Sequence, residues 1–323
     1  VDLIHAFNRL PVGTAPFIIG FESHLPRAYG LEKTAYYRLL GKSLAGSRCK
    51  GIIAISEYAK RHFIRQHKNQ PWFEALKEKL TVRYPNMPIP ATPDAFEPRA
   101  GEPVRLVFVG NHFGRKGGPV CVRLAALAQQ RNLPIQVDIV SSLEVGSVSW
   151  IDPLRPEFFE EDFRLLRSLP NIKYHGALPN KDVLALVAKA HFVMLPTFSD
   201  SFGYSAIEAM ANYTPVIATR QGALPEFIED GVSGLLLELE NDEVGEWKHI
   251  VPGDRYAPSF EALFNSEIDR LTHEAYAKLE NLMKNPAAYS AMRKAARSSA
   301  EKLFSSTDAN IFWDNYYIEA LKR

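Results

Sequence analysis

The sequence has few cysteines, no excess of either charge and no long apolar run. Its two cysteines, Cys49 and Cys121, lie far apart without metal-ligand spacing, which favours buried free thiols in a reducing compartment. The net charge of +1 gives no reason to expect a nucleic-acid partner. No segment approaches the roughly 18–20 apolar residues that a membrane span needs. These absences predict a cytoplasmic protein, and 323 residues with 46% hydrophobic content predict two globular domains.

Several signature motifs are also missing. Neither the Walker spacing G-x-x-x-x-G-K-[ST] nor the dinucleotide fingerprint G-x-G-x-x-G occurs. No D-x-D triplet suggests a metal-bound diphosphate, and no repeat or signal peptide is visible. We therefore expect neither a bound metal nor a resident cofactor.

What is present is an α/β pattern in two stretches separated by proline. The first stretch, taken as a domain over residues 1–94, has short apolar strands near residues 2–7, 16–21, 51–55 and 80–84. Helices are expected near 31–46, 57–67 and 72–79. A strand so close to Val1 predicts that the first domain is incomplete. The segment 84–93 contains four prolines, so neither a helix nor a central strand fits there, and a hinge is expected.

The second stretch, residues 95–306, alternates more regularly. Strands are expected at 104–109, 135–140, 172–174, 192–195, 216–218 and 234–237. Helices are expected at about 117–131, 157–168, 180–190, 203–212, 223–229 and 259–284. Such alternation predicts a parallel sheet covered on both faces, with ligands at the carboxyl ends of the strands. The aromatic C-terminal helix, 307–323, is expected to pack back on the first domain.

The most informative stretch is Thr197–Met210, which leads from a strand through a Ser- and Gly-rich turn into a helix. Asp200 and Glu208 bracket this entry with seven residues between them. A helix N-terminus beside a polar turn is suited to an anion. The plainer interpretation is that a carboxylate caps the helix and that Glu208 lies on a solvated face. The pattern alone favours neither this interpretation nor the anion site.

Two further segments follow strand ends of the same domain. The turn Gly110–Gly118 combines glycines with Arg115 and Lys116, which are suited to clamp a diphosphate. The other, Gly222–Ile228, brings a glycine and Glu226 to a neighbouring strand end. Each of these signals alone is weak.

With the three segments in this order, the chain resembles the retaining GT-B glycosyltransferases of family 4. The resemblance is carried by FVGNHFGRKGG, by NIKYHGALPNKDVLALVAKAHFVMLPTFSDSFGYSAIEAMANYTPVIATRQGALPEFIEDGVSGLLL, and by GIIAISEYAKRHF followed by VRYPN. It implies two Rossmann-like, doubly wound domains facing across a cleft. It also implies metal-independent transfer of a sugar from a nucleotide diphosphate to a hydroxyl of a polysaccharide, a glycolipid or a small molecule.

The resemblance assigns roles by position. The family's E-x7-E element falls on Asp200, which would bind sugar hydroxyls, and Glu208, which would bind the ribose. The first position departs from the family as Asp. The family's basic pair falls on Asn111 and Lys116, so its first cation is missing, and Arg115 is a candidate substitute. The implied catalytic residues are His24, Lys116 and Asp200. The other implied donor-binding residues are Gly176, Leu178, Ser201, Phe202, Gly203, Tyr204, Ser205 and Glu226.

Other assignments stay open. A structural role for His24 competes with the catalytic one, and His5, His112 and His175 are treated as structural or peripheral. A non-catalytic nucleotide-sugar-binding module and a GT-B-fold epimerase are the alternatives to a transferase. A glycoside hydrolase fits poorly, because eight positions of helix rise would hold Asp200 and Glu208 about 12 Å apart, beyond the roughly 5–9.5 Å of hydrolase carboxyls. Neither the base, the sugar nor the acceptor can be read from the sequence.

Residues 27–50 form a basic, amphipathic stretch. Six cations there oppose one acid, Glu32, and Tyr36, Leu39, Leu40 and Leu44 recur at helical spacing. Such a helix is suited to weak peripheral contact with anionic lipid at the inner face of a membrane. An ordinary helix packed by its apolar stripe is the plainer alternative.

Overall fold

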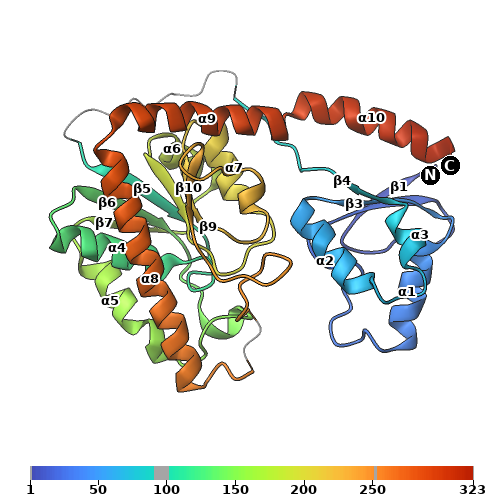
Figure 1. The fold of residues 1–323 in the computed structure, drawn as a ribbon, viewed down its shortest axis with the longest axis horizontal. Helices are drawn as coiled ribbons and strands as arrows, with labels where there is room; N and C mark the ends of the chain where they lie inside the picture. The colour runs from blue at the N-terminus through green and yellow to red at the C-terminus, as the bar shows by residue number, and fades with distance from the viewer. Residues whose placement is uncertain (1, 91–101, 251–252, 323) are drawn as a thin grey trace. The chain divides into compact units, whose positions relative to one another are not determined.

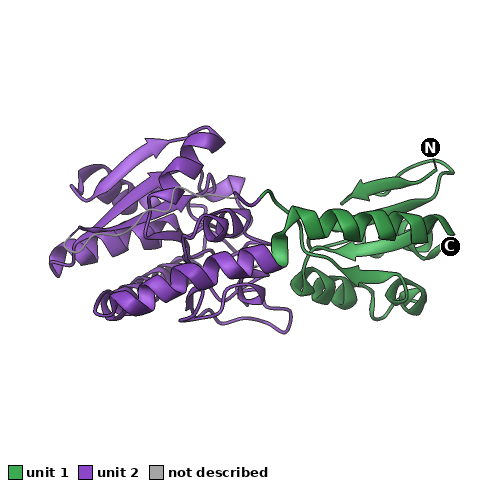
Figure 2. Cartoon of the chain, turned by 90° about the horizontal axis from the view of Figure 1, so that it is seen from above, with its two compact units in different colours: residues 1–88, 303–323 green, residues 89–302 purple. Residues whose placement is uncertain are grey.

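The computed structural model describes residues 2–90, 102–250 and 253–322. The chain divides into two compact units, residues 1–88 with 303–323 and residues 89–302 (Figure 2). Each unit is built on one parallel sheet with helices packed against it (Figure 1). The predicted α/β class is therefore confirmed. Of the expected hinge, residues 91–93 lie outside the described residues.

The first unit has a four-stranded sheet in the order β1-β2-β3-β4, with all strands parallel. The strands are β1 (Ile4–Phe7), β2 (Phe17–Phe21), β3 (Cys49–Ala54) and β4 (Leu80–Val82). The connecting helices are α1 (Ala35–Ala45), α2 (Glu57–His67) and α3 (Phe73–Lys77). Side-chain caps fix two helix starts, because the Thr34 and Ser56 hydroxyls accept from Tyr37 N and Ala59 N.

Helix α10 (Ser306–Lys322) covers this sheet on the face opposite α1, α2 and α3 (Figure 1). Its Trp313 and Tyr317 pack against Ile18 and Ile53 of β2 and β3. Gly51 makes this close approach possible, because a Cβ there would lie 2.0 Å from the Tyr316 hydroxyl. The aromatic tail is thus part of the core of the first unit.

The second unit has a six-stranded sheet in the order β10-β9-β8-β5-β6-β7, also parallel throughout. Its strands are β5 (Val104–Val109), β6 (Ile135–Val140), β7 (Ile172–Gly176), β8 (Phe192–Leu195), β9 (Val216–Thr219) and β10 (Gly234–Leu237). Every expected strand is present, and β7 runs two residues further than predicted. Continuous apolar runs fix these strands because both faces of the sheet are covered.

Helices cover both faces of this sheet (Figure 1). On one face α4 (Gly118–Gln130) packs against α5 (Glu160–Ser168) and the long α8 (Pro258–Met283), and on the other α6 (Asn180–Ala188) packs against α7 (Tyr204–Ala211). Helix α9 (Pro286–Phe304) follows α8. The predicted helix at 223–229 is wrong. Only a 3-10 turn, η3 (Leu224–Glu226), forms there, since the amides of Glu226 and Phe227 bond three residues back.

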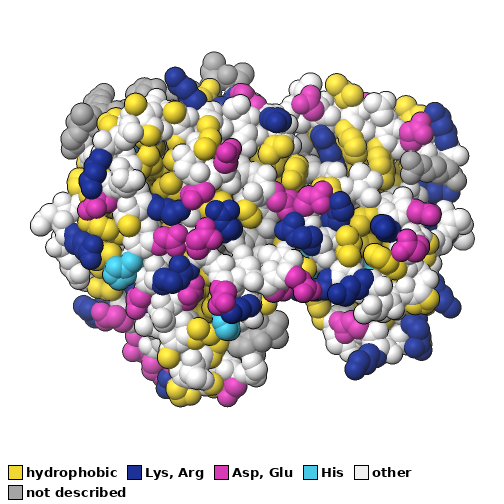
Figure 3. Space-filling model, in the orientation of Figure 1, with side chains coloured by type: hydrophobic (Ala, Val, Ile, Leu, Met, Phe, Trp, Pro, Cys, Tyr) yellow, Lys and Arg dark blue, Asp and Glu magenta, His cyan; other side chains and the backbone are white. Residues whose placement is uncertain are grey.

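The strand order turns at β5, which has β6 on one side and β8 on the other. From β5 the chain continues to β6 on one side, and from the adjacent strand β8 it continues to β9 on the other side. The loops at such a switch point commonly hold the ligand. No helix in the described part of the chain is long and apolar enough to cross a membrane. Basic and acidic side chains alternate over the face seen in Figure 3, in keeping with the net charge of +1.

Candidate active site

Two loops meet at the switch point, one after β5 and one after β8. Gly117 joins them tightly, because its φ of +82° favours glycine and a Cβ there would lie 2.0 Å from the Pro196 carbonyl oxygen. The buried Thr197 fastens the same junction, since its hydroxyl lies 3.1 Å from Arg115 O and accepts from Ser199 N at 3.2 Å. The two loops therefore form one fixed surface.

Lys116 and Asp200 form an ion pair across this surface. Asp200 is mostly buried and also accepts a hydrogen bond of 3.4 Å from Phe202 N through Oδ1. Burial alone would raise the pKa of the Asp200 carboxyl, but the charges of Lys116 and Arg115 and the Phe202 amide outweigh it and lower the pKa. The carboxylate is thus charged at neutral pH, beside the cation that the sequence predicted.

Arg115 points into the protein rather than into the open. It is 7% exposed, and its Nη1 donates to Ser199 O at 2.5 Å. Its guanidinium lies 4.7 Å from the centre of the Trp150 ring. Burial lowers the pKa of Arg115, although Asp200 and Asp152 oppose that shift. This geometry favours a role in holding the two loops together over the predicted direct contact with a donor.

Asn111, at the position of the family's first cation, is exposed just after β5. Its carbonyl accepts from Glu144 N at 2.9 Å, which ties the turn to the loop after β6. His112, next to it, lies 3.2 Å from Glu144 through Nδ1, and burial lowers its pKa.

Helix α7 begins at this surface. Gly203 precedes it with a φ of +88°, and a Cβ there would lie 2.7 Å from Leu224. Phe202 is buried against Phe227, whereas Tyr204 is half exposed and Ser201 and Ser205 are partly exposed. The first turn of the helix thus exposes Tyr204 and part of Ser205, and the helix dipole favours an anion at this end.

Glu208 lies one turn further along α7. Burial raises its pKa, and a hydrogen bond with the Asn180 side chain partly offsets that shift. Asn180 is the first residue of α6, so Glu208 faces the segment that follows β7. The two carboxylates of the motif therefore have different surroundings, one paired with lysine and one with an amide.

The end of β7 lies at the same edge of the sheet. His175 is bonded to Asp138 through Nε2 at 2.6 Å, which agrees with a structural role. Gly176 has a φ of +68°, and no atom lies within 4 Å of where a Cβ would stand, so its surroundings are open. Leu178, two residues on, is partly exposed before Asn180.

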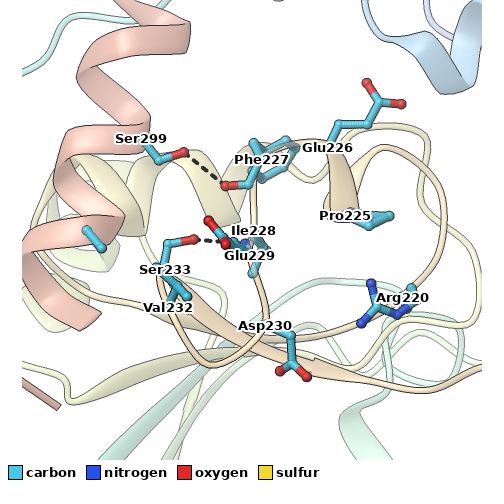
Figure 4. A pocket seen from close by; sticks show the side chains of 11 residues that line it. Arg220, Pro225, Glu226, Phe227, Ile228, Glu229, Asp230, Val232, Ser233 and Ser299 are labelled. Carbon is cyan, nitrogen blue, oxygen red and sulfur yellow. Dashed lines mark hydrogen bonds between the residues drawn. The ribbon is translucent and has the colours of Figure 1, made fainter. Parts of the chain in front are cut away.

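Gly222 supports Asp200 from the next strand end. Its φ is +60°, and a Cβ there would lie 2.2 Å from the Asp200 carbonyl oxygen, which also accepts from Gln221. Glu226 follows in η3 and is partly exposed. Figure 4 shows its carboxylate extended away from Ser299 and Phe227. The pocket in that view, of about 360 Å³, is lined by Arg220, Asp230 and Ser233 among others, and none of the residues around Lys116 lines it.

His24 belongs to the first unit, in the loop after β2. Its ring lies 4.8 Å from that of His62 and 5.4 Å from that of Tyr29, between centroids. Its predicted catalytic role stays a prediction, since the site above is built within the second unit.

Sequence reasoning missed the contribution of the loop after β6. Asp152 in that loop is fully buried and accepts from Ser149 Oγ at 3.1 Å and Gly146 N at 3.2 Å. Burial raises its pKa to about 6, although these bonds and the charges of Arg255 and Arg115 oppose the shift. Gly114 leaves room for it, because a Cβ there would lie 2.5 Å from Asp152 Oδ2. The signal that could have revealed this loop is its aromatic and acidic segment, 150–152, soon after a strand end.

Within residues 2–90, 102–250 and 253–322, no three His, Cys, Asp or Glu side chains gather as metal ligands would. The site is thus defined by Lys116, Asp200, Glu208 and the start of α7.

Comparison with known proteins shows what this part of the chain is similar to. Residues 103–248 match the family model described as glycosyl transferases group 1. The D-inositol 3-phosphate glycosyltransferase of Corynebacterium kroppenstedtii is 33% identical over 133 residues, 41% of this chain and 29% of the relative. That of an Arthrobacter species is 28% identical over 188 residues, 55% of this chain and 42% of the relative. The matched region therefore spans less than half the length of these curated relatives.

Solved structures extend the likeness to the whole chain. A glycosyltransferase from Rickettsia africae superposes with a TM-score of 0.66 at 18% identity, covering 100% of this chain and 78% of that one. Anabaena Alr3699/HepE, solved in complex with UDP, superposes with a TM-score of 0.59 at 16% identity, covering 93% of this chain and 71% of that one. The chain has the GT-B glycosyltransferase fold, which confirms the predicted fold class, and the candidate site lies inside the segment that matches the family model.

Proposed function

We propose that this chain transfers a sugar from a nucleotide diphosphate to a hydroxyl acceptor, with retention of anomeric configuration and without a metal. The observation that carries the proposal is the Lys116–Asp200 ion pair at the switch point, next to the start of α7. The match of residues 103–248 to group 1 glycosyl transferases supports it. So do the UDP and UDP-glucose that the solved Anabaena relative binds.

The chemistry requires charge to move onto the leaving group. When the bond between the anomeric carbon and the phosphate oxygen breaks, its electron pair stays on the diphosphate. In this proposal Lys116 and the N-terminal end of α7 stabilise that charge, which is greater in the transition state than in the bound donor. The departing phosphate oxygen then takes the proton of the acceptor hydroxyl, whose oxygen bonds to the anomeric carbon on the same face.

The donor is held along the loop ends. In this proposal the Asp200 carboxylate accepts hydrogen bonds from hydroxyls of the sugar, and its ion pair holds the Lys116 side chain in place until the diphosphate competes for the lysine. The Glu208 carboxylate accepts hydrogen bonds from the ribose hydroxyls, and its hydrogen bond with the Asn180 side chain holds it in place. Gly176 and Leu178 border the base, and Glu226 borders the sugar. An acceptor would be a polysaccharide, a glycolipid or a small molecule.

The test is binding followed by turnover. Thermal-shift measurements with UDP, GDP and ADP and their sugars should show stabilisation by one nucleotide, and release of that nucleotide from its sugar should follow slowly even without acceptor. Glu208→Ala should weaken binding of the free nucleotide as well as turnover. A shift without any release would identify a non-catalytic binding module, isomerised donor would identify an epimerase, and no shift with any nucleotide would refute the proposal.

A second proposal concerns the basic stretch in the first unit. Helix α1 packs by Tyr37, Gly41 and Leu44. Tyr36 and Leu39 were expected in one stripe with Leu44, but they are exposed, Leu39 by 65%. Packing within the unit therefore does not account for these two apolar side chains.

The exposed residues form a mixed apolar and basic face. Tyr29 and Leu31 in the preceding loop are exposed as well, and the cations that join the face are Lys33, Arg38 and Lys42. We infer weak peripheral binding to an anionic bilayer, because apolar side chains can enter the headgroup region while the cations attract the lipid charge.

Co-sedimentation with vesicles of phosphatidylcholine and phosphatidylglycerol tests this inference. Arg38→Glu with Lys42→Glu should abolish binding, and so should Tyr36→Ser with Leu39→Ser. The matched control is Lys294→Glu with Lys302→Glu, two exposed lysines on α9 whose reversal changes net charge equally. If all three double variants still bind the vesicles, or if the control variant loses binding to the same extent, binding through this face of α1 is refuted.

A further inference from the structure

Trp150 is an exposed aromatic residue in an otherwise buried run. Trp150 is 55% exposed, whereas Ser149, Ile151 and Asp152 on either side are buried. Two other tryptophans, Trp72 and Trp247, are nearly fully buried. An exposed indole of this size offers an apolar face that a ligand can cover.

The ring is held at the candidate active site. It stacks on the guanidinium of Arg115 at 4.7 Å. Arg115 is the neighbour of Lys116 in the chain and donates to the carbonyl of Ser199, the neighbour of Asp200. Through Arg115 and the Ser199 carbonyl that it contacts, the indole is therefore connected to both of the loops that carry the ion pair.

The backbone beneath the ring is fixed on both sides. The Ser149 hydroxyl lies 3.1 Å from Asp152 Oδ1 and accepts from Ile151 N at 3.3 Å. Arg255 ties the same loop down by donating to Asp152 O and Gly146 O at 2.7 Å each. A ring on such a support keeps its orientation, which lowers the entropy lost when a ligand packs on it.

We propose that Trp150 is a stacking residue for a pyranose ring held beside Lys116 and Asp200. Arg115 occupies one part of the indole surface and the exposed remainder is available to a ligand. The C–H groups of a pyranose are apolar and slightly positive, so they suit the negative face of the indole, while the sugar hydroxyls point past its edge. This inference rests on the proposed transfer of a sugar.

A sugar fits this position better than a nucleobase. The expected ribose ligand, Glu208, bonds to Asn180 in the layer of α6 and α7. The Trp150 loop is tied instead to Arg255, just before α8, in the layer on the other side of the sheet. The nucleoside would thus lie toward the layer of α6 and α7 and the indole toward the layer of α8, so the indole suits the sugar end of the ligand better than the base.

Binding and kinetics of Trp150→Phe and Trp150→Ala test the proposal, with Val148→Ala as the matched control. Val148 is an exposed apolar residue of the same loop, two positions away. The probes are UDP with UDP-glucose and GDP with GDP-mannose, and a panel of free hexoses serves as acceptors. Thermal melting of each variant separates a folding defect from a binding defect, and Trp150→Phe keeps an aromatic ring if Trp150→Ala fails to fold.

In Trp150→Ala the affinity for the free nucleotide should stay within twofold of wild type. Affinity for the nucleotide sugar should fall by about two- to tenfold if the donor sugar stacks there, and the acceptor KM should rise by as much if the acceptor does. Trp150→Phe should be intermediate. Equal weakening of free nucleotide and nucleotide sugar, or wild-type constants throughout, would overturn the proposal. A wild-type protein that binds none of the nucleotides would instead overturn the proposed function.

Discussion

Lys116 and Asp200 lie 84 positions apart in the sequence, yet their charged groups are in contact at the ends of two adjacent strands. Lys116 follows β5 and Asp200 follows β8, and these strands pair along Leu106–Phe108. The contact joins a cation suited to a diphosphate with a carboxylate suited to sugar hydroxyls. Substitutions at each partner, and at the residues that support them, distinguish their roles.

Lys116→Ala removes the cation. Loss of a charge-assisted hydrogen bond of roughly 1.5–3 kcal/mol should lower kcat/KM by about ten- to a hundredfold. The matched control is Lys248→Ala, which breaks an exposed ion pair with Glu240 in the same unit. Steady-state kinetics should show little change in that control, and an equal effect of both variants, or none, would contradict a diphosphate contact.

Asp200→Glu restores the residue type that the family pattern has at this position but lengthens the side chain by one methylene. The mostly buried Asp200 side chain forms an ion pair with Lys116 and accepts a hydrogen bond from the backbone amide of Phe202. We expect a loss of stability of about 1–3 kcal/mol from overpacking and lower affinity for the nucleotide sugar. Asp230→Glu is the control, since Asp230 also pairs with a lysine and a backbone amide but is more exposed. Wild-type kinetics in Asp200→Glu would show that the site accepts either length.

Gly222→Ala tests the support beneath Asp200. Both Gly222 and Gly231 have positive φ, so an alanine at either costs roughly 1–2 kcal/mol from backbone strain. Only at Gly222 would the new Cβ also meet the Asp200 carbonyl, because nothing lies within 4 Å of a Cβ at Gly231. Urea unfolding should therefore show a larger loss in Gly222→Ala, accompanied by weaker nucleotide-sugar binding. Equal losses in the two variants would refute the close packing.

Asp152 predicts a pH dependence of stability. Its folded pKa of about 6 lies above the ordinary value of 3.8, so the folded protein binds the proton more tightly than the unfolded chain. Its contribution is therefore most favourable below about pH 4 and declines as the pH rises through 6, by on the order of 3 kcal/mol. Asp152→Asn removes this titration.

Urea unfolding of wild type and Asp152→Asn at pH 4.5, 5.5 and 7 gives the difference in unfolding free energy directly. Relative to the variant, the wild type should lose stability with rising pH over this window. A difference that is constant with pH, or that changes in the opposite direction, would show that Asp152 is not strained by burial.

Much of the fold could be predicted from local pattern. The strands β5, β6, β8 and β10 have the expected limits, because each is a continuous apolar run between polar turns. The start of α7 after Gly203 was also predictable from its glycine and serines. Where local pattern competed with tertiary contact, prediction failed. The segment 223–229 has helix-forming residues but is held in a short turn whose Gly222 packs on Asp200.

The site divides in the same way. Sequence placed Lys116, Asp200 and Glu208 at strand ends and helix starts, because parallel strands bring their carboxyl ends to one edge of the sheet. It could not show that Arg115 is buried under Trp150 while Lys116 beside it faces Asp200. Neighbouring residues in a turn point in different directions, and which one enters the core depends on distant residues.

The succession of strands and helices and the candidate groups of the site follow from the sequence alone, since hydrophobic period and turn chemistry are local properties. Which of those groups meet depends on the tertiary structure. Three contacts join segments that are distant in the chain: the Lys116–Asp200 ion pair, the Glu208–Asn180 hydrogen bond and the close packing of Asp152 on Gly114. Such contacts are fixed by strand order and by the space that glycines leave, and neither is a property of any short stretch of sequence.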